Sequence, residues 1–509
     1  MERRTFLKIL SSAGIVSLVS PTFAMEVCKN KVSKSSSALL ESAFRNPPFS
    51  SGVYTWWHWM NGNITKDGIT RDLEAMKANG IAGYQLFEAG SGIPIGPVES
   101  LSDEWVDLIL HTLKESERLG LEFAMHNCPG WSSSGGPWIT PDKAMQIITW
   151  SETKITGGKQ VRIQLPTPKH MFDYYIDTYC LAIPANMKVI PRLSILELSN
   201  RLDKDGVLTW DVPAGEWLIM RFGQTAKDQK NKSAPSKSTG LDCDKFSTEA
   251  LDYHLNCMFK RLMPTMEKIA KHSKIGLLID SYETGDQDWT SDMPAYFEQS
   301  NGYELYPFLP VLANKIVESE ESTKRFLFDF RRVRADMFAE RYYGHFQKRC
   351  KEKGIITYTE PYGGNMMEEL QVAQQLDINM GEFWCGQTVL WANYKYNRTV
   401  KQVASIAHTL GGKVVGAEAF TSEPDADKWL QYPYALKSLG DYMFTRGLSR
   451  IYFHRFAHQP HPTAAPGMTM GAWGLHFDRT NTWWKPGKAW IEYLNRCQYI
   501  FQSSTFYGD

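Results

Sequence analysis

Eight short apolar runs, each typical of a buried β-strand, recur along the chain and alternate with segments of helical periodicity. Helical patterns such as 66–79, 102–119 and 321–353 separate them, and connections of this length suit parallel strands joined by crossover helices. Eight β/α units are what a (β/α)8 TIM barrel requires, so we expect an α/β fold of this type. The eight runs are 52–60, 81–87, 120–126, 275–280, 355–359, 378–383, 413–420 and 450–456.

The pattern changes between the third and fourth of these runs. From 150 to 245 the chain shows strand-like alternation, turn residues and proline, with little helical periodicity. We therefore expect a β-rich insertion at 150–245, which ends with the loop-like stretch 227–240. The barrel would then comprise residues 51–149 and 246–509.

The N-terminus has the composition of an export signal. Arg3 and Arg4 precede an apolar run from Ile9 to Val19, and a small residue, Ala24, ends the segment. This predicts a secretory signal at 1–24 of the twin-arginine type, followed by a polar leader at 25–50, although a short buried helix would give a similar pattern. We expect export to the periplasm or the extracellular space. No later stretch reaches the ~20 apolar residues of a membrane helix, so we expect no membrane span.

The composition narrows the class of partner. The chain has 56 basic and 56 acidic residues, so it lacks the excess of positive charge typical of proteins that bind nucleic acid. Its 17 Trp, 23 Tyr and 25 Phe suit stacking against flat apolar ligand faces such as sugar rings. The eight cysteines form no CxxC or Cys/His group, which argues against zinc or iron–sulfur sites, and export would permit disulfides.

Acidic residues follow four of the predicted strands. Asp280 and Glu283 come after the fourth strand, Glu360 after the fifth, Glu382 at the sixth and Glu418 at the seventh. The active site of a TIM barrel lies at the C-terminal ends of its strands. Acidic residues are rare beside apolar strands unless they are paired, metal-bound or functional. We therefore expect a pocket lined by carboxylates.

Glycoside hydrolysis is one reaction that such a pocket suits, because it needs one protonated and one ionised carboxyl group on either side of the scissile bond. Glu283 and Glu418 are our candidate pair. A separation of about 5 Å would indicate a retaining enzyme and about 6.5–9.5 Å an inverting one. Alternatively, Glu283 is a helix-start residue and Glu418 forms a salt bridge at the barrel rim.

The other three acidic residues could bind a cation together. Asp280, Glu360 and Glu382 offer hard oxygen ligands, which favour calcium over a transition metal. A hydrogen-bonded carboxylate network with Arg or Lys explains the residues themselves equally well.

Aromatic and polar residues at the ends of the first, third and eighth strands could contact a sugar. Core packing is the default for tryptophan, and three Trp within four positions cannot all point into the barrel from one strand. The histidines after the eighth strand could equally be structural. The candidates for substrate binding are Trp56, Trp57, Trp59, Asn61, His126, His454 and His458.

Several of these motifs resemble glycoside hydrolase family 106, the α-L-rhamnosidases. They are the stretches 56–77, 280–285, 416–421, 454–460 and 473–484, and they follow the family's order from about residue 45 to the end of the chain. The resemblance implies an inverting, calcium-dependent enzyme on a TIM barrel that cleaves terminal α-L-rhamnosyl residues from glycans. By motif, Glu283 resembles the general acid and Glu418 the general base. Asp280 and Glu382 would lie on the metal side, with Glu360 as a further candidate.

The chemistry of rhamnose is consistent with this resemblance. Calcium can chelate the cis hydroxyls at C2 and C3, and the C6 methyl group suits an apolar or aromatic wall. Members of the family usually continue beyond the barrel into β-rich domains, so we expect a chain without those C-terminal domains. The alternatives are a retaining TIM-barrel glycosidase that uses the same Glu pair and a truncated, non-catalytic carbohydrate-binding protein.

Overall fold

A computed structural model describes residues 34–90, 92–385, 389–412, 414–422, 428–471 and 475–507. The chain divides into two compact units, 1–48 and 49–509, and helix α3 (Lys34–Arg45) belongs to the first. The predicted signal at 1–24 lies outside the described residues. Among the helices described, none has the length and apolar character needed to cross a membrane.

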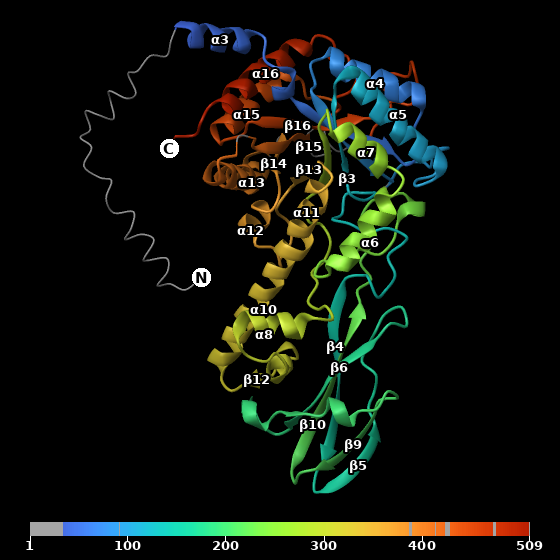
Figure 1. Ribbon diagram of the computed structural model, residues 1–509, viewed down its shortest axis with the longest axis vertical. Coiled ribbons are helices and arrows are strands. Elements are labelled where there is room, and N and C mark those ends of the chain that lie inside the picture. The colour runs from blue at the N-terminus through green and yellow to red at the C-terminus, as the bar shows by residue number, and fades with distance from the viewer. Residues whose placement is uncertain are drawn as a thin grey trace, which may run out of the picture. The chain divides into compact units, whose positions relative to one another are not determined.

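The second unit contains a closed barrel of eight parallel strands, which confirms the predicted TIM barrel. Their order around the barrel is β1-β16-β15-β14-β13-β11-β3-β2, and Figure 1 shows β13 to β16 side by side. The strands are β1 (Tyr54–Met60), β2 (Gly83–Ala89), β3 (Glu122–His126), β11 (Ile275–Ile279), β13 (Ile356–Thr359), β14 (Ile378–Cys385), β15 (Gly416–Ser422) and β16 (Arg450–Ala457).

Helices follow the strands because the sequence supplies start and stop residues at their ends. The hydroxyl of Thr65 caps α4 (Lys66–Ala78), and that of Ser102 caps α5 (Asp103–Leu119). Gly120 ends α5 in the left-handed conformation, with a φ of 66°. The remaining helices of eight or more residues are α6 (Thr248–Phe259), α7 (Met263–Ala270), α8 (Met293–Asn301), α10 (Glu320–Met337), α13 (Val389–Leu410), α15 (Pro433–Thr445) and α16 (Lys488–Ser503).

The helix predicted at 321–353 consists of three parts. After α10, residues Phe338–Gly344 form a π-helical stretch, and α11 (His345–Lys351) follows directly. The π-helical stretch carries Tyr342 and Tyr343, which are fully buried.

A β-rich segment lies between β3 and β11, as the sequence pattern predicts. Strands β4 (Gln146–Thr156), β10 (Glu216–Ala226), β6 (Ile176–Pro184) and β8 (Leu196–Glu197) form a four-stranded sheet. Figure 1 shows β4, β6 and β10 together. Strands β5 (Lys159–Gln164) and β9 (Val207–Val212) form a separate pair. Strand β7 (Val189–Ile190) pairs in parallel with β12 (Ile316–Val317), so this segment is joined to the chain after β11.

The barrel strands alternate between two layers of packing. Tyr54, Trp56 and Phe87 belong to a cluster of interior side chains. Trp57 and Trp59 belong instead to the large core cluster that also contains residues of α4 and α5. This alternation decides which side chains of a strand can reach the mouth of the barrel.

Candidate active site

A cavity of about 800 Å³ lies at the C-terminal ends of the barrel strands. Side chains from three of the strands or the loops that follow them contribute its acidic lining: Asp280, Glu283, Glu382 and Glu418. Two cationic side chains, Lys232 and Arg398, also line it. The acidic residues predicted from the strand ends are therefore gathered around one space, with Glu360 buried close by.

Asp280 and Glu360 are almost completely buried. Burial raises the pKa of Asp280 well above its ordinary value, and the negative charge of Glu283 raises it further. Burial likewise raises the pKa of Glu360, followed by the charge of Asp280. The hydroxyl of Tyr362 donates a 2.6 Å hydrogen bond to Glu360 Oε2. Two oxygens, Asp280 Oδ1 and Glu360 Oε1, have no hydrogen-bond partner among the described residues.

Glu382 and Glu418 lie on neighbouring strands in direct register. The indole N–H of Trp384 donates a hydrogen bond to Glu382, and the hydroxyl of Thr421 donates one to Glu418. Burial, and after it the charge of Glu382, raise the pKa of Glu418 well above its ordinary value. Without a ligand, these effects favour the protonated form of Glu418.

Glu283 has a different environment, at the rim of the cavity. Its side chain is 38% exposed, and its Oε2 atom forms an ion pair of 2.7 Å with Nζ of Lys232. The lysine belongs to the loop that follows β10.

The predicted calcium ligands are Asp280, Glu360 and Glu382. Within the described part of the chain, no three His, Cys, Asp or Glu side chains form a group that could already hold a metal ion. The donor chemistry does fit a hard cation, because Asp280 and Glu360 each present a buried carboxylate oxygen without a partner. Asp280 and Glu382 line the cavity, whereas Glu360 lies behind its lining.

Two buried histidines contribute to the cavity wall. His454 lines it, with Nδ1 3.6 Å from Glu418 Oε1, and burial lowers its pKa well below the ordinary value. His58 also lines it, and burial followed by the proximity of His454 lowers its pKa in the same way. Both imidazoles are therefore neutral near pH 7 and can each donate and accept a hydrogen bond. His58 was not among our sequence candidates, although it lies between two of them.

His126 does not line the cavity. It is buried at the end of β3, where Nδ1 lies 2.8 Å from the Cys128 carbonyl oxygen and Nε2 accepts a 3.4 Å hydrogen bond from the Asp280 amide. Burial lowers its pKa to about 4. It thus supports the backbone at Asp280.

The structure brings only one of the three predicted tryptophans to the cavity. Trp56 lines it, whereas Trp57 and Trp59 are fully buried in the core cluster outside the barrel interior. The prediction that Trp57 and Trp59 bind substrate is corrected because successive side chains of a strand point to opposite faces.

Asn61 and His458 also have structural surroundings, which corrects their assignment as sugar-binding residues. Asn61 adopts a positive φ of 46° in the turn after β1, and its side chain donates a 2.6 Å hydrogen bond to the Ile93 carbonyl. His458 is fully buried, and its Nδ1 atom lies 2.8 Å from Asp72 Oδ2. Neither residue lines the cavity.

Two residues of the apolar part of the wall were not among the sequence candidates. Trp131 and Met470 line the cavity and pack against a small buried cluster of Met60, Ala89 and Ala457. Both lie in loops, at positions where no strand or helix periodicity points toward the site.

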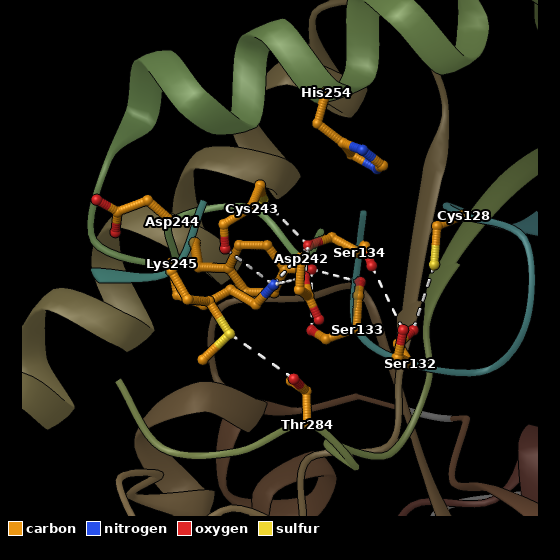
Figure 2. Close-up of polar contacts among 12 residues, drawn as sticks. Cys128, Ser132, Ser133, Ser134, Asp242, Cys243, Asp244, Lys245, His254 and Thr284 are labelled. Carbon is orange, nitrogen blue, oxygen red and sulfur yellow. Dashed lines mark hydrogen bonds and ion pairs between the residues drawn. The ribbon is translucent and has the colours of Figure 1, made fainter. Parts of the chain in front are cut away.

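A second buried polar network joins the end of the β-rich segment to the loop that follows β3. Lys245 and Asp242 form an ion pair in which both side chains are fully buried, and Nζ of Lys245 also donates to Ser134 Oγ. Figure 2 shows Lys245 reaching Asp242 and Ser134 from one side, with His254 across the cluster. Because Ser134 follows β3, this network fastens the end of the β-rich segment to the barrel.

Sequence comparison decides the family. The profile of the alpha-L-rhamnosidase family, glycoside hydrolase family 106, matches residues 45–178 and 169–509. The chain belongs to this family. The resemblance seen in the sequence motifs is therefore confirmed.

One solved structure and one named sequence are similar to this chain over most of its length. A rhamnosidase from Novosphingobium sp. PP1Y is 24% identical, with a TM-score of 0.83, and the match covers 91% of this chain and 61% of that one. A Formosa agariphila protein named "Putative beta-glucuronidase" is 40% identical over 501 residues, which cover 92% of this chain and 42% of that protein. The chain thus spans about three fifths of the length of the Novosphingobium rhamnosidase and about two fifths of the length of the Formosa agariphila protein.

Proposed function

We propose that this chain hydrolyses terminal α-L-rhamnosyl residues of glycans, with Glu283 as general acid and Glu418 as general base. The observation that carries the proposal is one cavity that contains both glutamates, in a chain that belongs to the α-L-rhamnosidase family. The cavity volume suits a sugar ring and part of its aglycone.

In the proposed reaction, the carboxyl group of Glu283 gives its proton to the glycosidic oxygen while the bond from that oxygen to the anomeric carbon breaks. A water molecule attacks the anomeric carbon from the opposite face, and Glu418 takes the proton that this water releases. The product sugar has the inverted anomeric configuration. Glu418 must be ionised to act in this way, so the bound state has to offset the burial that raises its pKa.

We also propose that calcium belongs to this site, with Asp280 and Glu360 as ligands and Glu382 as a nearby carboxylate. Bound there, calcium would chelate neighbouring sugar hydroxyls, and its charge would favour the ionised forms of the surrounding carboxyl groups. The support is the pair of buried carboxylate oxygens without partners and the mutual repulsion within the acidic cluster.

The apolar wall supports a 6-deoxy sugar over a uronic acid. Trp131 and Met470 offer surface for a methyl group, whereas a C6 carboxylate would need a cation. The name of the Formosa agariphila relative makes a β-glucuronide the second candidate substrate, and the two lining cations, Lys232 and Arg398, favour it. Both cations already have carboxylate partners, Glu283 and Glu369, which leaves the rhamnoside as our first choice.

The first test is the variant Glu418→Gln with an aryl α-L-rhamnoside. Loss of the base should lower kcat by roughly 10²–10⁴-fold while sugar binding persists. NMR of the first-formed product distinguishes inversion from retention, and an aryl β-glucuronide assayed in parallel tests the second candidate. Full turnover by Glu418→Gln would refute its role, a retained anomer would favour the retaining alternative, and binding without turnover by the parent chain would favour a non-catalytic protein.

The calcium proposal predicts a change in stability that does not depend on activity. Calcium in 100-fold excess over its dissociation constant should stabilise the protein by about 2.7 kcal/mol, and this gain should disappear in the double variant Asp280→Asn, Glu360→Gln. Thermal unfolding with calcium, with magnesium and with a chelator measures it. The matched control is Glu88→Gln, which removes a buried carboxyl group outside the cavity lining and should keep the response. An equal calcium response in the double variant would contradict the proposal.

We further propose that residues 1–24 direct export. The support is the paired arginines, the apolar run and the small residue at the end of the segment. Fractionation of a bacterial host that expresses the chain with and without these residues tests it, and equal retention in the cytoplasm would contradict it.

A further inference from the structure

The loop that follows β10 returns to the mouth of the barrel and is held there from two sides. The amide of Gly90, after β2, donates a 2.7 Å hydrogen bond to the Ser233 carbonyl. The amide of Trp131, after β3, donates a 3.1 Å hydrogen bond to the Lys232 carbonyl. The backbone at residues 232 and 233 is therefore fixed against two loops of the active-site face.

The close approach of these loops depends on glycine. A Cβ atom on Gly130 would lie 2.0 Å from the Lys232 carbonyl oxygen, and Gly130 also has a φ of 81°. No other residue type fits this contact without a backbone shift. The position of Lys232 is thus built into the fold and is not a consequence of a free surface loop.

The base of the same loop is anchored in the buried network of Figure 2. The amide of Asp242 donates a 2.8 Å hydrogen bond to the Gln229 carbonyl, and the Asp242 side chain is fully buried in its ion pair with Lys245. Asn231 adds a 3.1 Å hydrogen bond to the Pro129 carbonyl. Residues 229–242 therefore form a braced loop, and its one side chain that lines the cavity is that of Lys232.

The contact that this loop makes inside the cavity is with the proposed acid. Nζ of Lys232 lies 2.7 Å from Glu283 Oε2, and both side chains are partly exposed, at 54% and 38%. An ion pair as exposed as this contributes little to folding stability. The braced loop nevertheless fixes the backbone from which Lys232 reaches Glu283, which points to a role in the site itself.

The negative charges near Glu283 make such a cation useful. Asp280 precedes it on the same loop, and Glu418 lies across the cavity on β15, each coupled electrostatically to Glu283. When a glutamic acid gives up its proton, it becomes a carboxylate in this acidic surrounding, which is unfavourable. An ammonium group at hydrogen-bonding distance offsets that cost.

We propose that Lys232 is a positioning residue through which the β-rich segment completes the active site: it orients Glu283 and stabilises the carboxylate left after proton donation. The proton passes from Glu283 to the glycosidic oxygen, the carboxylate remains beside the lysine, and water at the exposed rim reprotonates Glu283 before the next turnover. This role rests on the proposed function of Glu283 as general acid.

The test uses two rhamnosides whose leaving groups differ in their need for protonation. Methyl α-L-rhamnoside requires the acid, whereas the dinitrophenyl glycoside departs without it. We expect Lys232→Met to lower kcat/KM for the methyl glycoside by roughly tenfold or more, and for the dinitrophenyl glycoside by less than about twofold. Lys232→Arg, which keeps the charge, should recover most of the loss. A merely structural role would affect both substrates equally.

Lys230→Met is the matched control, because Lys230 lies in the same loop, is 56% exposed and pairs with Asp228. Its kcat/KM should equal that of the parent chain for both substrates. Thermal unfolding of each variant checks that all fold.

Glu283→Gln separates this inference from the proposed function. If Glu283→Gln lowers kcat/KM equally for both substrates, or if the parent chain hydrolyses neither, Glu283 is not the general acid. The proposed role of Lys232 then fails as well. If Glu283→Gln shows the leaving-group dependence and Lys232→Met does not, the inference about Lys232 alone is overturned.

Discussion

Glu88, at the end of β2, is a single buried carboxyl group that makes stability depend on pH. Burial raises its pKa from 4.5 to about 7, partly offset by a hydrogen bond from Ser100. Its Oε1 atom has no hydrogen-bond partner among the described residues, so ionisation of the folded protein leaves a charge poorly solvated.

The sign of this effect follows from proton binding. Below pH 4.5 both states are protonated, and between pH 4.5 and 7 the folded state keeps a proton that the unfolded state has lost. The free energy of unfolding therefore falls over this window as pH rises, and above pH 7 the loss is complete. We predict that Glu88→Gln gains roughly 2–4 kcal/mol relative to the parent chain between pH 5 and pH 8.

Urea unfolding of both proteins at a series of pH values measures this gain. The other raised carboxyl groups, such as Asp280 and Glu418, are present in both proteins and cancel in the comparison. Glu74→Gln, at a site where the glutamate is half exposed, serves as control. Its free energy of unfolding should depend on pH in the same way as that of the parent chain. Parallel curves for Glu88→Gln as well would contradict the burial argument.

At the scale of the elements, the strands were predictable because they are buried on both faces. Every residue of β1, β2, β11 and β16 is buried, and apolar residues predominate in each strand, with β11 apolar throughout. The acidic residues then mark the strand ends, which a parallel barrel brings to one side. This simple rule predicted Asp280, Glu382 and Glu418 in one cavity.

The orientation of individual side chains was harder to predict from the sequence. The sequence indicates that Trp56 and Trp57 point in opposite directions, but the phase of the alternation is fixed only when the strand packs between its neighbours. Lys232 was missed for a different reason. Its place in the site depends on contacts with residues near 90, 131 and 283, which are distant in sequence and leave no periodic signal.

At the scale of the whole molecule, one buried carboxylate joins the first β/α unit to the last. Asp72 of α4 is fully buried and accepts hydrogen bonds from Arg479, at 2.7 Å, and from His458, at 2.8 Å. The amide of Gln459 and the indole N–H of Trp57 also donate to it. Because His458 and Gln459 follow β16, these contacts close the barrel between its two ends in the sequence.

We predict that Asp72→Ala destabilises the protein by about 3–5 kcal/mol, because it removes the acceptor of the buried His458 imidazole and Gln459 amide and the charge partner of the partly buried Arg479 guanidinium. Asp67→Ala is the matched control from the same helix. Asp67 is 61% exposed and pairs with Arg71 one turn away, an interaction worth about 0.3–0.5 kcal/mol. Urea unfolding followed by circular dichroism measures both variants. The prediction is wrong if the two lose similar stability, and the closure of the barrel would then rest on backbone pairing between β1 and β16 and not on this carboxylate.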